Sequence, residues 1–458
     1  MVMEATQTLA KFAATLRFDD LPDRTRQHCK NLLLDALACA VAGRLGEEAG
    51  QVKAFAAALA QGREASVVCG ESLSLTGATL LNAYLVTAVT MCDVYRPTLT
   101  HITPEVVPPA LAIAERDGCS GRDLLTALAA GCEVTTRIGL GLDYPNFRAR
   151  GWHGPGVIGP FGAAAAVGRL LGLDADTMAR AFGLAGSQAA GTFAAWGTPT
   201  VKFHQCRGAL SGLMAALLAQ QQFVATREFL TAKDGGLYNA YADGGLPDMA
   251  VAELGKHWEL EQIAMRLWPS ASLIQGMATA LFAILERHHI EFAEVRKVRV
   301  GLSPGAHKMH GGFGSYKGKF EALLSVHYTA AAILRDRALT LTQFEPGRYD
   351  DPELRRFAAE RVEAYGDGAI EGSQAKVDIE MGGGAALSER CEHPLGSFEN
   401  PLSRHQIAQK FRTYARGMLP EANIAGIVEA VEHLEDFGAI GGLMDMLRAA
   451  PRTMAAAE

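Results

Sequence analysis

The sequence lacks the features that mark several large classes of protein. Aromatic residues make up only 7% of its 458 residues, and no two of its eight cysteines form a Cys-x-x-Cys pair. Cysteines without this spacing are expected to be small buried hydrophobes in a reducing compartment. The apolar runs are too short to span a bilayer, and the N-terminus shows no basic region followed by an apolar core. We therefore expect a cytoplasmic protein without a membrane partner.

The sequence also lacks an excess of positive charge and the common cofactor motifs. The formal net charge is -7, which argues against a nucleic-acid partner. There is no Walker A loop, no His-Glu-x-x-His, and no Cys/His cluster with the spacing of zinc ligands. These absences predict that the protein has no metal site and needs no cofactor.

Two glycine motifs match known fingerprints by letter only. Gly154-x-Gly156-x-x-Gly159 has the dinucleotide spacing, but no strand pattern precedes it. We interpret these glycines as the start of a helix that lies close to another backbone. Gly301-x-Ser303-x-Gly305 has the nucleophile-elbow spacing, but Pro304 interrupts it and we expect no helix after it.

What the sequence does contain is a long series of helical patterns rich in alanine and glycine. The hydrophobic fraction is 49%, typical of a globular chain, and 458 residues are too many for one ordinary core. The patterns predict helices over residues 208–222, 320–334 and 352–364, and over residues 124–138 after a capping box formed by Ser120 and Asp123. Only residues 295–302 and 375–381 alternate as strands do. This predicts a mainly α fold, with a large all-helical domain built from residues 1–266 and 399–458. A smaller α+β domain, residues 267–398, is inserted between them.

The stretch from Met91 to Ala110 is the first candidate for chemistry. A buried helical run stops at Asp93, and a short polar loop then leads to His101. Thr103 is the expected N-cap of the next helix. Loops held between rigid helices are common places for functional residues. The alternative is that Asp93 only caps a helix end and that His101 is an ordinary surface residue.

Further titratable residues lie on segments that we expect to be loops at helix starts. These residues are Tyr144, His153, Lys202, His204 and Arg266. Cations beside a glycine-rich helix N-terminus, here Gly154 and Gly156, bind carboxylates well. An imidazole or a lysine next to them can remove a proton α to a carboxylate, and an Asp or Tyr can return one. Each histidine, taken alone, has the alternative of a purely structural role.

Five separate stretches, in the right order, then make the chain resemble the MmgE/PrpD family. That family includes 2-methylcitrate dehydratase, cis-aconitate decarboxylase and iminodisuccinate epimerase. The resemblance rests on Leu21-Pro22 with Leu34 to Ala38, on Gly151-Trp152-His153 with Gly162 to Ala166 and Leu171 to Asp174, on Trp268-Pro269, on Phe320-Glu321-Ala322 with Ser325 and Tyr328, and on Asn400 to Ser403 with Lys410-Phe411.

The resemblance implies a homodimer of two-domain subunits that acts on a small polycarboxylate without a cofactor. By position, Asp93, His101 and His153 match site residues of the family. Lys202 matches a family lysine if a shift of one residue is accepted, and Arg266 stands where a lysine is usual. From this we predict that His101 or His153 abstracts the proton and that Asp93 or Tyr144 is the opposite acid. Lys202, His204, Arg266 and the helix N-terminus at Gly154 and Gly156 would bind the substrate.

The departures from the family pattern lie around this predicted site. Cys92-Asp93 replaces two adjacent acids, and Ile102 follows the loop histidine where the family commonly has proline. Near Gln275 the family commonly has a histidine. Dehydration, decarboxylation and epimerisation all use the same proton transfer, so the residues do not choose among them, and dehydration is placed first. A non-catalytic carboxylate-binding dimer is the alternative of a different class.

Overall fold

The computed structural model describes residues 5–312 and 314–448 and divides the chain into two compact units. The first unit contains Met1–Ile263 and Arg404–Glu458, and the second contains Ala264–Ser403. The sequence analysis predicted the two transitions after residues 266 and 398. The fold is mainly α, as predicted. All strands of the four-stranded sheet belong to the second unit.

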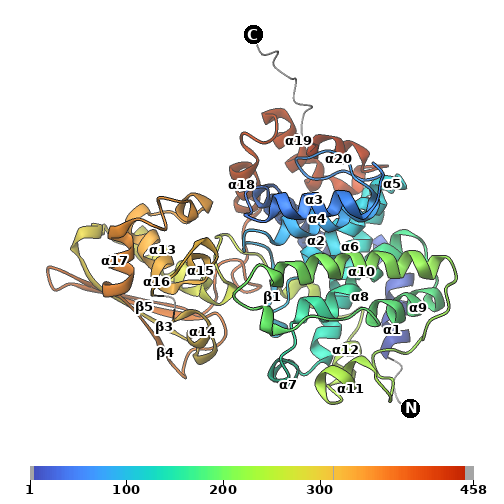
Figure 1. Cartoon of the computed structure of the whole chain (residues 1–458), viewed down its shortest axis with the longest axis horizontal. Coiled ribbons are helices and arrows are strands. Elements are labelled where there is room, and N and C mark those ends of the chain that lie inside the picture. Colours follow the sequence, from blue (N-terminus) through green and yellow to red (C-terminus); the bar gives the residue numbers. More distant parts are fainter. Residues whose placement is uncertain (1–4, 313, 449–458) are drawn as a thin grey trace, which may run out of the picture. The chain divides into compact units, whose positions relative to one another are not determined.

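The first unit consists almost entirely of helices (Figure 1). These helices are α1 (Ala5–Thr15), α2 (Asp23–Gly43), α3 (Ala49–Leu59), α4 (Leu75–Thr87), α5 (Thr103–Arg116), α6 (Gly121–Gly141), α7 (Tyr144–Ala149), α8 (Gly154–Leu170), α9 (Ala175–Gly186), α10 (Thr200–Gln220), α11 (Leu237–Ala242), α12 (Pro247–Val251), α18 (Arg404–Ala415), α19 (Glu421–Glu432) and α20 (Gly441–Leu447). The short strand β1 (Val94–Tyr95) lies in the loop between α4 and α5, and β2 (Ile263–Ala264) lies where the first unit ends.

Helix α8 forms the centre of the first unit, where it packs against α5, α6, α9 and α10. Every residue from Gly154 to Gly168 is buried, so this helix has no polar face. Small residues at the contacts let the backbones approach closely: a Cβ atom added at Gly131 of α6 would lie 2.7 Å from the carbonyl oxygen of Gly162. The high alanine and glycine content of the sequence therefore serves close helix packing.

The start of α6 follows the capping signal in the sequence. The hydroxyl of Ser120 accepts a hydrogen bond from the backbone N–H of Asp123 at 3.1 Å. The carboxylate of Asp123 in turn accepts from the backbone N–H of Ser120 at 3.2 Å. The predicted capping box is confirmed, and it satisfies donors that a helix start leaves without partners.

The end of the chain returns to the first unit through α18, which packs on α2. Lys410 of α18 forms a buried ion pair with Asp35 of α2, at 2.6 Å between Nζ and Oδ1. The same ammonium donates to the carbonyl oxygen of Met91 at 3.1 Å. This lysine therefore joins the return segment to the residues just before Asp93.

The second unit contains a four-stranded sheet with the order β4-β3-β5-β6. Its strands are β3 (Val295–Leu302), β4 (Val362–Gly366), β5 (Ala375–Met381) and β6 (Ala386–Cys391), and its helices are α13 (Gln275–Arg287), α14 (Pro304–His310), α15 (Lys319–Leu324), α16 (Val326–Asp336) and α17 (Pro352–Arg361). Strand β3 pairs parallel with β4 and antiparallel with β5. The parallel pair needs a long crossover, which α14 to α17 supply.

Three local expectations for the second unit need correction. The helix expected over residues 320–334 is two helices, because the hydroxyl of Ser325 caps α16 by accepting from Tyr328 N–H at 3.0 Å. The helix expected to reach residue 364 ends at Arg361 and continues as β4. A helix, α14, does follow Ser303, although none was expected; Pro304 is its first residue, where proline is well accommodated.

Ser303 nevertheless has the contacts of a helix cap. Its hydroxyl accepts from the N–H of Ala306 at 3.3 Å and donates to the carbonyl oxygen of Gly372 at 2.8 Å. Both bonds use the oxygen that a nucleophile would need. The Gly301-x-Ser303-x-Gly305 match is therefore explained by the start of α14.

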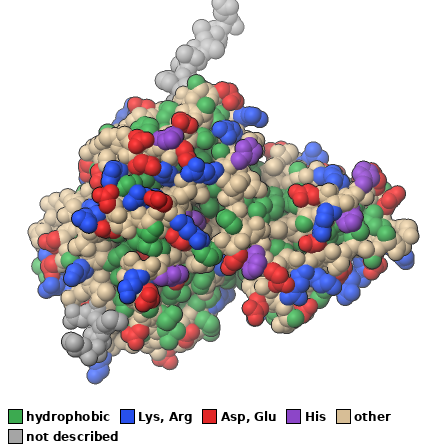
Figure 2. Space-filling view, turned by 180° about the vertical axis from the view of Figure 1, so that it is seen from behind, with side chains coloured by type: hydrophobic (Ala, Val, Ile, Leu, Met, Phe, Trp, Pro, Cys, Tyr) green, Lys and Arg blue, Asp and Glu red, His purple; other side chains and the backbone are tan. Residues whose placement is uncertain are grey.

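The surface of the described residues carries both signs of charge. Figure 2 shows Lys and Arg side chains interspersed with Asp and Glu over the face it presents. Among the residues that the structure describes, none of the helices is long and apolar enough to cross a bilayer.

Candidate active site

The carboxylate of Asp93 holds the start of α5. Its two oxygens accept hydrogen bonds from the backbone N–H groups of Ile102 at 2.8 Å and Thr103 at 3.0 Å, and the Thr103 hydroxyl donates to it as well. The expectation that Thr103 is the N-cap is wrong, because Thr103 is the first helical residue and a distant side chain supplies the capping oxygen. Burial raises the pKa of Asp93 to about 6, although these hydrogen bonds oppose the shift.

The ring of His101 is oriented by the main chain of the same loop. Its Nδ1 lies 2.6 Å from the carbonyl oxygen of Asp93. A carbonyl can only accept, so we infer that Nδ1 carries the proton of the neutral ring and that Nε2 is the basic nitrogen. Asp93 thus fixes the loop with its side chain and the tautomer of His101 with its backbone.

His153 precedes α8 and lies beside the same loop. Its backbone N–H donates to the carbonyl oxygen of Gly191 at 3.0 Å, and its Nδ1 lies 2.9 Å from Nδ1 of His204. One of these two imidazoles must donate and the other accept. Burial, with smaller contributions from the nearby His204, His101 and Arg148, lowers the pKa of His153 to about 3. The three histidines therefore lie near one another, and His153 is neutral at neutral pH.

The glycines at the start of α8 allow this approach. A Cβ atom at Gly154 would lie 2.5 Å from the hydroxyl oxygen of Thr100, the residue before His101. A Cβ atom at Gly156 would overlap the carbonyl oxygen of Ala190. The predicted role of these glycines in close backbone packing agrees with these contacts, while a substrate contact to their N–H groups stays a prediction.

Tyr144 and Arg148 lie one turn apart on α7, and the arginine contacts a ring that packs against His153. The guanidinium of Arg148 lies 3.3 Å from the ring centre of Phe193, whose edge faces His153 at 5.9 Å between ring centres. Burial raises the pKa of Tyr144 to about 12, while Arg148 lowers it, so the phenol keeps its proton. The sequence analysis did not select Arg148 or Phe193; the position of Arg148 four residues after Tyr144 was the only available signal.

Lys202 and His204 lie in the first turn of α10, not in a loop, because this helix begins at Thr200, eight residues earlier than expected. Their side chains contact different neighbours. Lys202 is buried and forms an ion pair with Glu48 at 3.1 Å, and Glu48 also accepts from the hydroxyl of Tyr84 at 2.6 Å. His204 contacts His153 instead. Glu48 is a partner that no sequence signal indicated.

Arg266 belongs to the second unit and is buried there. Its Nη1 donates to the carbonyl oxygen of Ser270 at 3.0 Å, and Gln275 donates to the Ser270 hydroxyl at 2.8 Å. The predicted role of Arg266 in binding a carboxylate stays a prediction. Within the residues that the structure describes, no group of three or more His, Cys, Asp or Glu side chains is arranged to hold a metal ion.

Both units of the chain match models of one protein family. The model of the MmgE/PrpD N-terminal domain matches residues 7–249, and that of the MmgE/PrpD C-terminal domain matches residues 268–436. The chain belongs to the MmgE/PrpD family. It is therefore an enzyme of the lyase or isomerase type, as the sequence predicted.

Curated relatives match the chain from end to end. Cis-aconitate decarboxylase of Aspergillus terreus is 27% identical over 470 residues, covering 96% of this chain and 95% of the relative. The cis-aconitate decarboxylase-like protein oryM of Aspergillus oryzae is 26% identical and covers 96% and 97%. Human cis-aconitate decarboxylase is 26% identical, covering 98% of this chain and 95% of the relative.

Proposed function

We propose that the protein is a cofactor-independent lyase that transfers a proton on a small polycarboxylate, with decarboxylation of cis-aconitate as its first candidate reaction. The end-to-end likeness to cis-aconitate decarboxylases favours this reaction over the dehydration that the sequence analysis placed first. Dehydration of 2-methylcitrate and epimerisation of an aminodicarboxylate such as iminodisuccinate are the alternatives that the assay must separate.

The orientation of His101 is the observation that supports proton transfer. Because its Nδ1 donates to the backbone of Asp93, the basic Nε2 is held in one direction by a buried, capped loop. His153 and His204 lie nearby. Because His153 is neutral, it adds no positive charge beside His101. An imidazole held with its basic Nε2 in one direction is suited to accept a proton from carbon, the step that dehydration and epimerisation require.

The acid of the reaction is better assigned to Tyr144 than to Asp93. The carboxylate of Asp93 already accepts three hydrogen bonds at the start of α5, so we assign it a positioning role. Tyr144 keeps its proton at neutral pH. In decarboxylation, the bond to the departing carboxylate breaks, its electron pair forms the new double bond, and the former alkene carbon receives a proton. In dehydration, the base takes the α proton and the acid protonates the departing hydroxyl.

A mass-resolved assay in deuterated water tests the proposal directly. The full-length protein is incubated with cis-aconitate, 2-methylcitrate and an aminodicarboxylate. Loss of carbon dioxide with uptake of one deuteron identifies the decarboxylase, loss of water the dehydratase, and deuterium uptake without loss the epimerase. Binding of these acids with neither exchange nor turnover would contradict the proposal and support a non-catalytic carboxylate-binding protein.

His101→Ala tests the assigned base. Removing a general base costs about 10²–10⁴-fold in turnover, so kcat is expected to fall by this factor on a substrate that loses a carbon-bound proton, by dehydration or epimerisation. His289→Ala, which removes a histidine with an 83% exposed side chain, serves as the matched control and should keep wild-type kcat. Full turnover by His101→Ala on such a substrate, with an unchanged circular dichroism spectrum, would contradict the role of His101.

We also propose that the enzyme works as a homodimer, as the family resemblance implies. Large apolar side chains are exposed on α3 and α10, among them Phe55 and Phe203, whose rings lie 6.4 Å apart. Exposed apolar clusters of this kind are common at subunit contacts. Light scattering of the wild type should give twice the chain mass, and Phe55→Ser/Phe203→Ser should shift it toward the monomer. A monomeric wild type at assay concentration would contradict this proposal.

A further inference from the structure

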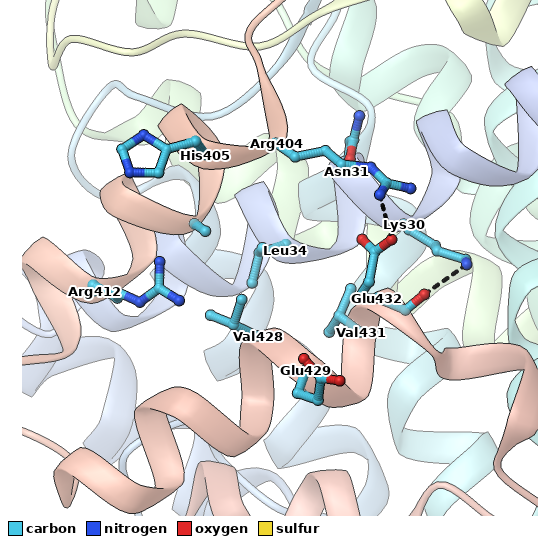
Figure 3. Close-up of a pocket in the computed structure, with 11 residues that line it drawn as sticks. Lys30, Asn31, Leu34, Arg404, His405, Arg412, Val428, Glu429, Val431 and Glu432 are labelled. Carbon is cyan, nitrogen blue, oxygen red and sulfur yellow. Dashed lines mark hydrogen bonds and ion pairs between the residues drawn. The ribbon is translucent and has the colours of Figure 1, made fainter.

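A pocket of about 300 Å³ opens between α2, α18 and α19 of the first unit, and its lining includes none of the residues assigned to catalysis (Figure 3). Its volume is at the lower end of the range of small-molecule sites. The pocket is lined with apolar surface from Leu34, Ala408, Val428 and Val431. It joins a helix from the start of the chain to two helices from its end.

Part of the charge around the pocket is neutralised within the protein. Lys30 donates to the carbonyl oxygen of Glu432 at 2.7 Å and forms an ion pair with Glu435 at 2.6 Å. Arg404 forms an ion pair with Glu432 at 2.6 Å. Figure 3 marks the contacts of Lys30 and Arg404 with Glu432 by dashed lines. These groups form a closed set of contacts and do not call for a ligand.

Arg412 and His405 differ from that set. They lie two turns apart on one face of α18 with Ala408 between them, and Figure 3 shows both on the same side of the pocket. Within the described part of the chain, neither side chain forms an ion pair or hydrogen bond. Arg412 is half-buried, and a guanidinium stays charged and presents paired donors that match the two oxygens of a carboxylate.

The acidic residues limit what the pocket accepts. Glu429 lines the pocket, and its contact with His433 at 3.3 Å is neutralising only when that imidazole is protonated. A second carboxylate on the ligand would therefore meet a negative charge. We propose that the pocket binds a small organic monocarboxylate, with its carboxylate on Arg412 and its apolar body against Leu34, Ala408 and Val428.

Binding should stabilise the protein, because the ligand contacts helices from both ends of the chain and is absent from the unfolded state. Hexanoate is the probe. We expect hexanoate to bind with a dissociation constant in the millimolar range. At tens of millimolar it should therefore raise Tm by about 2 °C in a thermal-shift measurement. Hexanol, which has the same body without the charge, should leave Tm unchanged.

Three variants locate the effect. Arg412→Gln should abolish the shift by hexanoate, and Val428→Phe should abolish it by filling the pocket. Arg416→Gln removes the same charge at the residue directly after α18, which does not line the pocket, and it should keep the shift. His153→Ala should also keep it, which separates this pocket from the catalytic histidines.

The outcomes that overturn the inference are equally specific. A shift that persists in Arg412→Gln, or one that is lost in His153→Ala, would place hexanoate elsewhere. No shift in the wild type, an equal shift by hexanol, or a larger shift by succinate or leucine would exclude a monocarboxylate as the preferred class.

Discussion

Glu105 lies on α5 with its whole side chain buried, and neither carboxyl oxygen has a hydrogen-bond partner among the described residues. Gly159 and Gly208 make room for it, since a Cβ atom at Gly159 would overlap its carboxyl carbon. Burial raises the pKa of Glu105 well above its ordinary value, although nearby Arg207 lowers it. The protein therefore keeps a neutral carboxylic acid in the core of the helical unit.

Glu105→Met should make the protein more stable by about 1–3 kcal/mol, because a buried polar group without partners costs this much. The unfolded carboxyl loses its proton at a lower pH than the folded one, so the wild type loses stability as pH rises above the unfolded pKa. The gain from Glu105→Met should accordingly grow between pH 5 and pH 8, as measured by urea denaturation. A variant that is less stable at every pH would show that Glu105 has partners that the structure does not contain.

At the scale of elements, the packing of α18 on α2 shows how the end of the chain supports the loop before Asp93. Lys410 and Asp35 are both buried, and Lys410 also donates to Met91. The geometry of the Asp93 loop therefore depends on a helix more than 300 positions away along the chain.

Lys410→Met should destabilise the protein by about 3–5 kcal/mol, because it leaves the charge of Asp35 buried without its counter-ion. Lys410→Met/Asp35→Leu should recover most of that loss, since the apolar pair has no charge to desolvate. Urea denaturation of the two variants beside the wild type measures both effects. A single variant that loses less than about 1 kcal/mol would contradict the importance of this pair.

At the scale of the whole molecule, buried neutral histidines occur in both units. Burial lowers the pKa of His28 to about 4, of His153 to about 3 and of His310 to about 4. The unfolded chain takes up these protons below its ordinary pKa of about 6.5, whereas the folded chain does not until pH 4 or lower. Each histidine thus contributes stability above pH 6.5 that is lost as pH falls toward 4. Asp93 acts in the opposite sense, because its raised pKa makes the carboxylate unfavourable above about pH 4.

His310→Gln should flatten the acid side of the stability profile. Between pH 6 and pH 4.5, one such histidine contributes a slope of about 1.4 kcal/mol per pH unit. The glutamine amide can still donate to the carbonyl oxygen of Leu324, the partner of His310 at 3.0 Å. Denaturation midpoints at several pH values provide the comparison, and an unchanged slope would show that His310 is protonated in the folded state.

The sequence by itself determined the local features of this protein. Helical periodicity, the Ser120 capping box, the alternation of residues 295–302 and the small residues of α8 all depend on near neighbours in the chain, and each appears in the structure. Only the tertiary structure decided that Asp93 caps α5, that Lys202 pairs with Glu48 and that His153 meets His204. It also decided that the carboxyl group of Glu105 finds no hydrogen-bond partner among the described residues. These contacts depend on burial and on which helices pack together, and neighbouring residues carry no record of either.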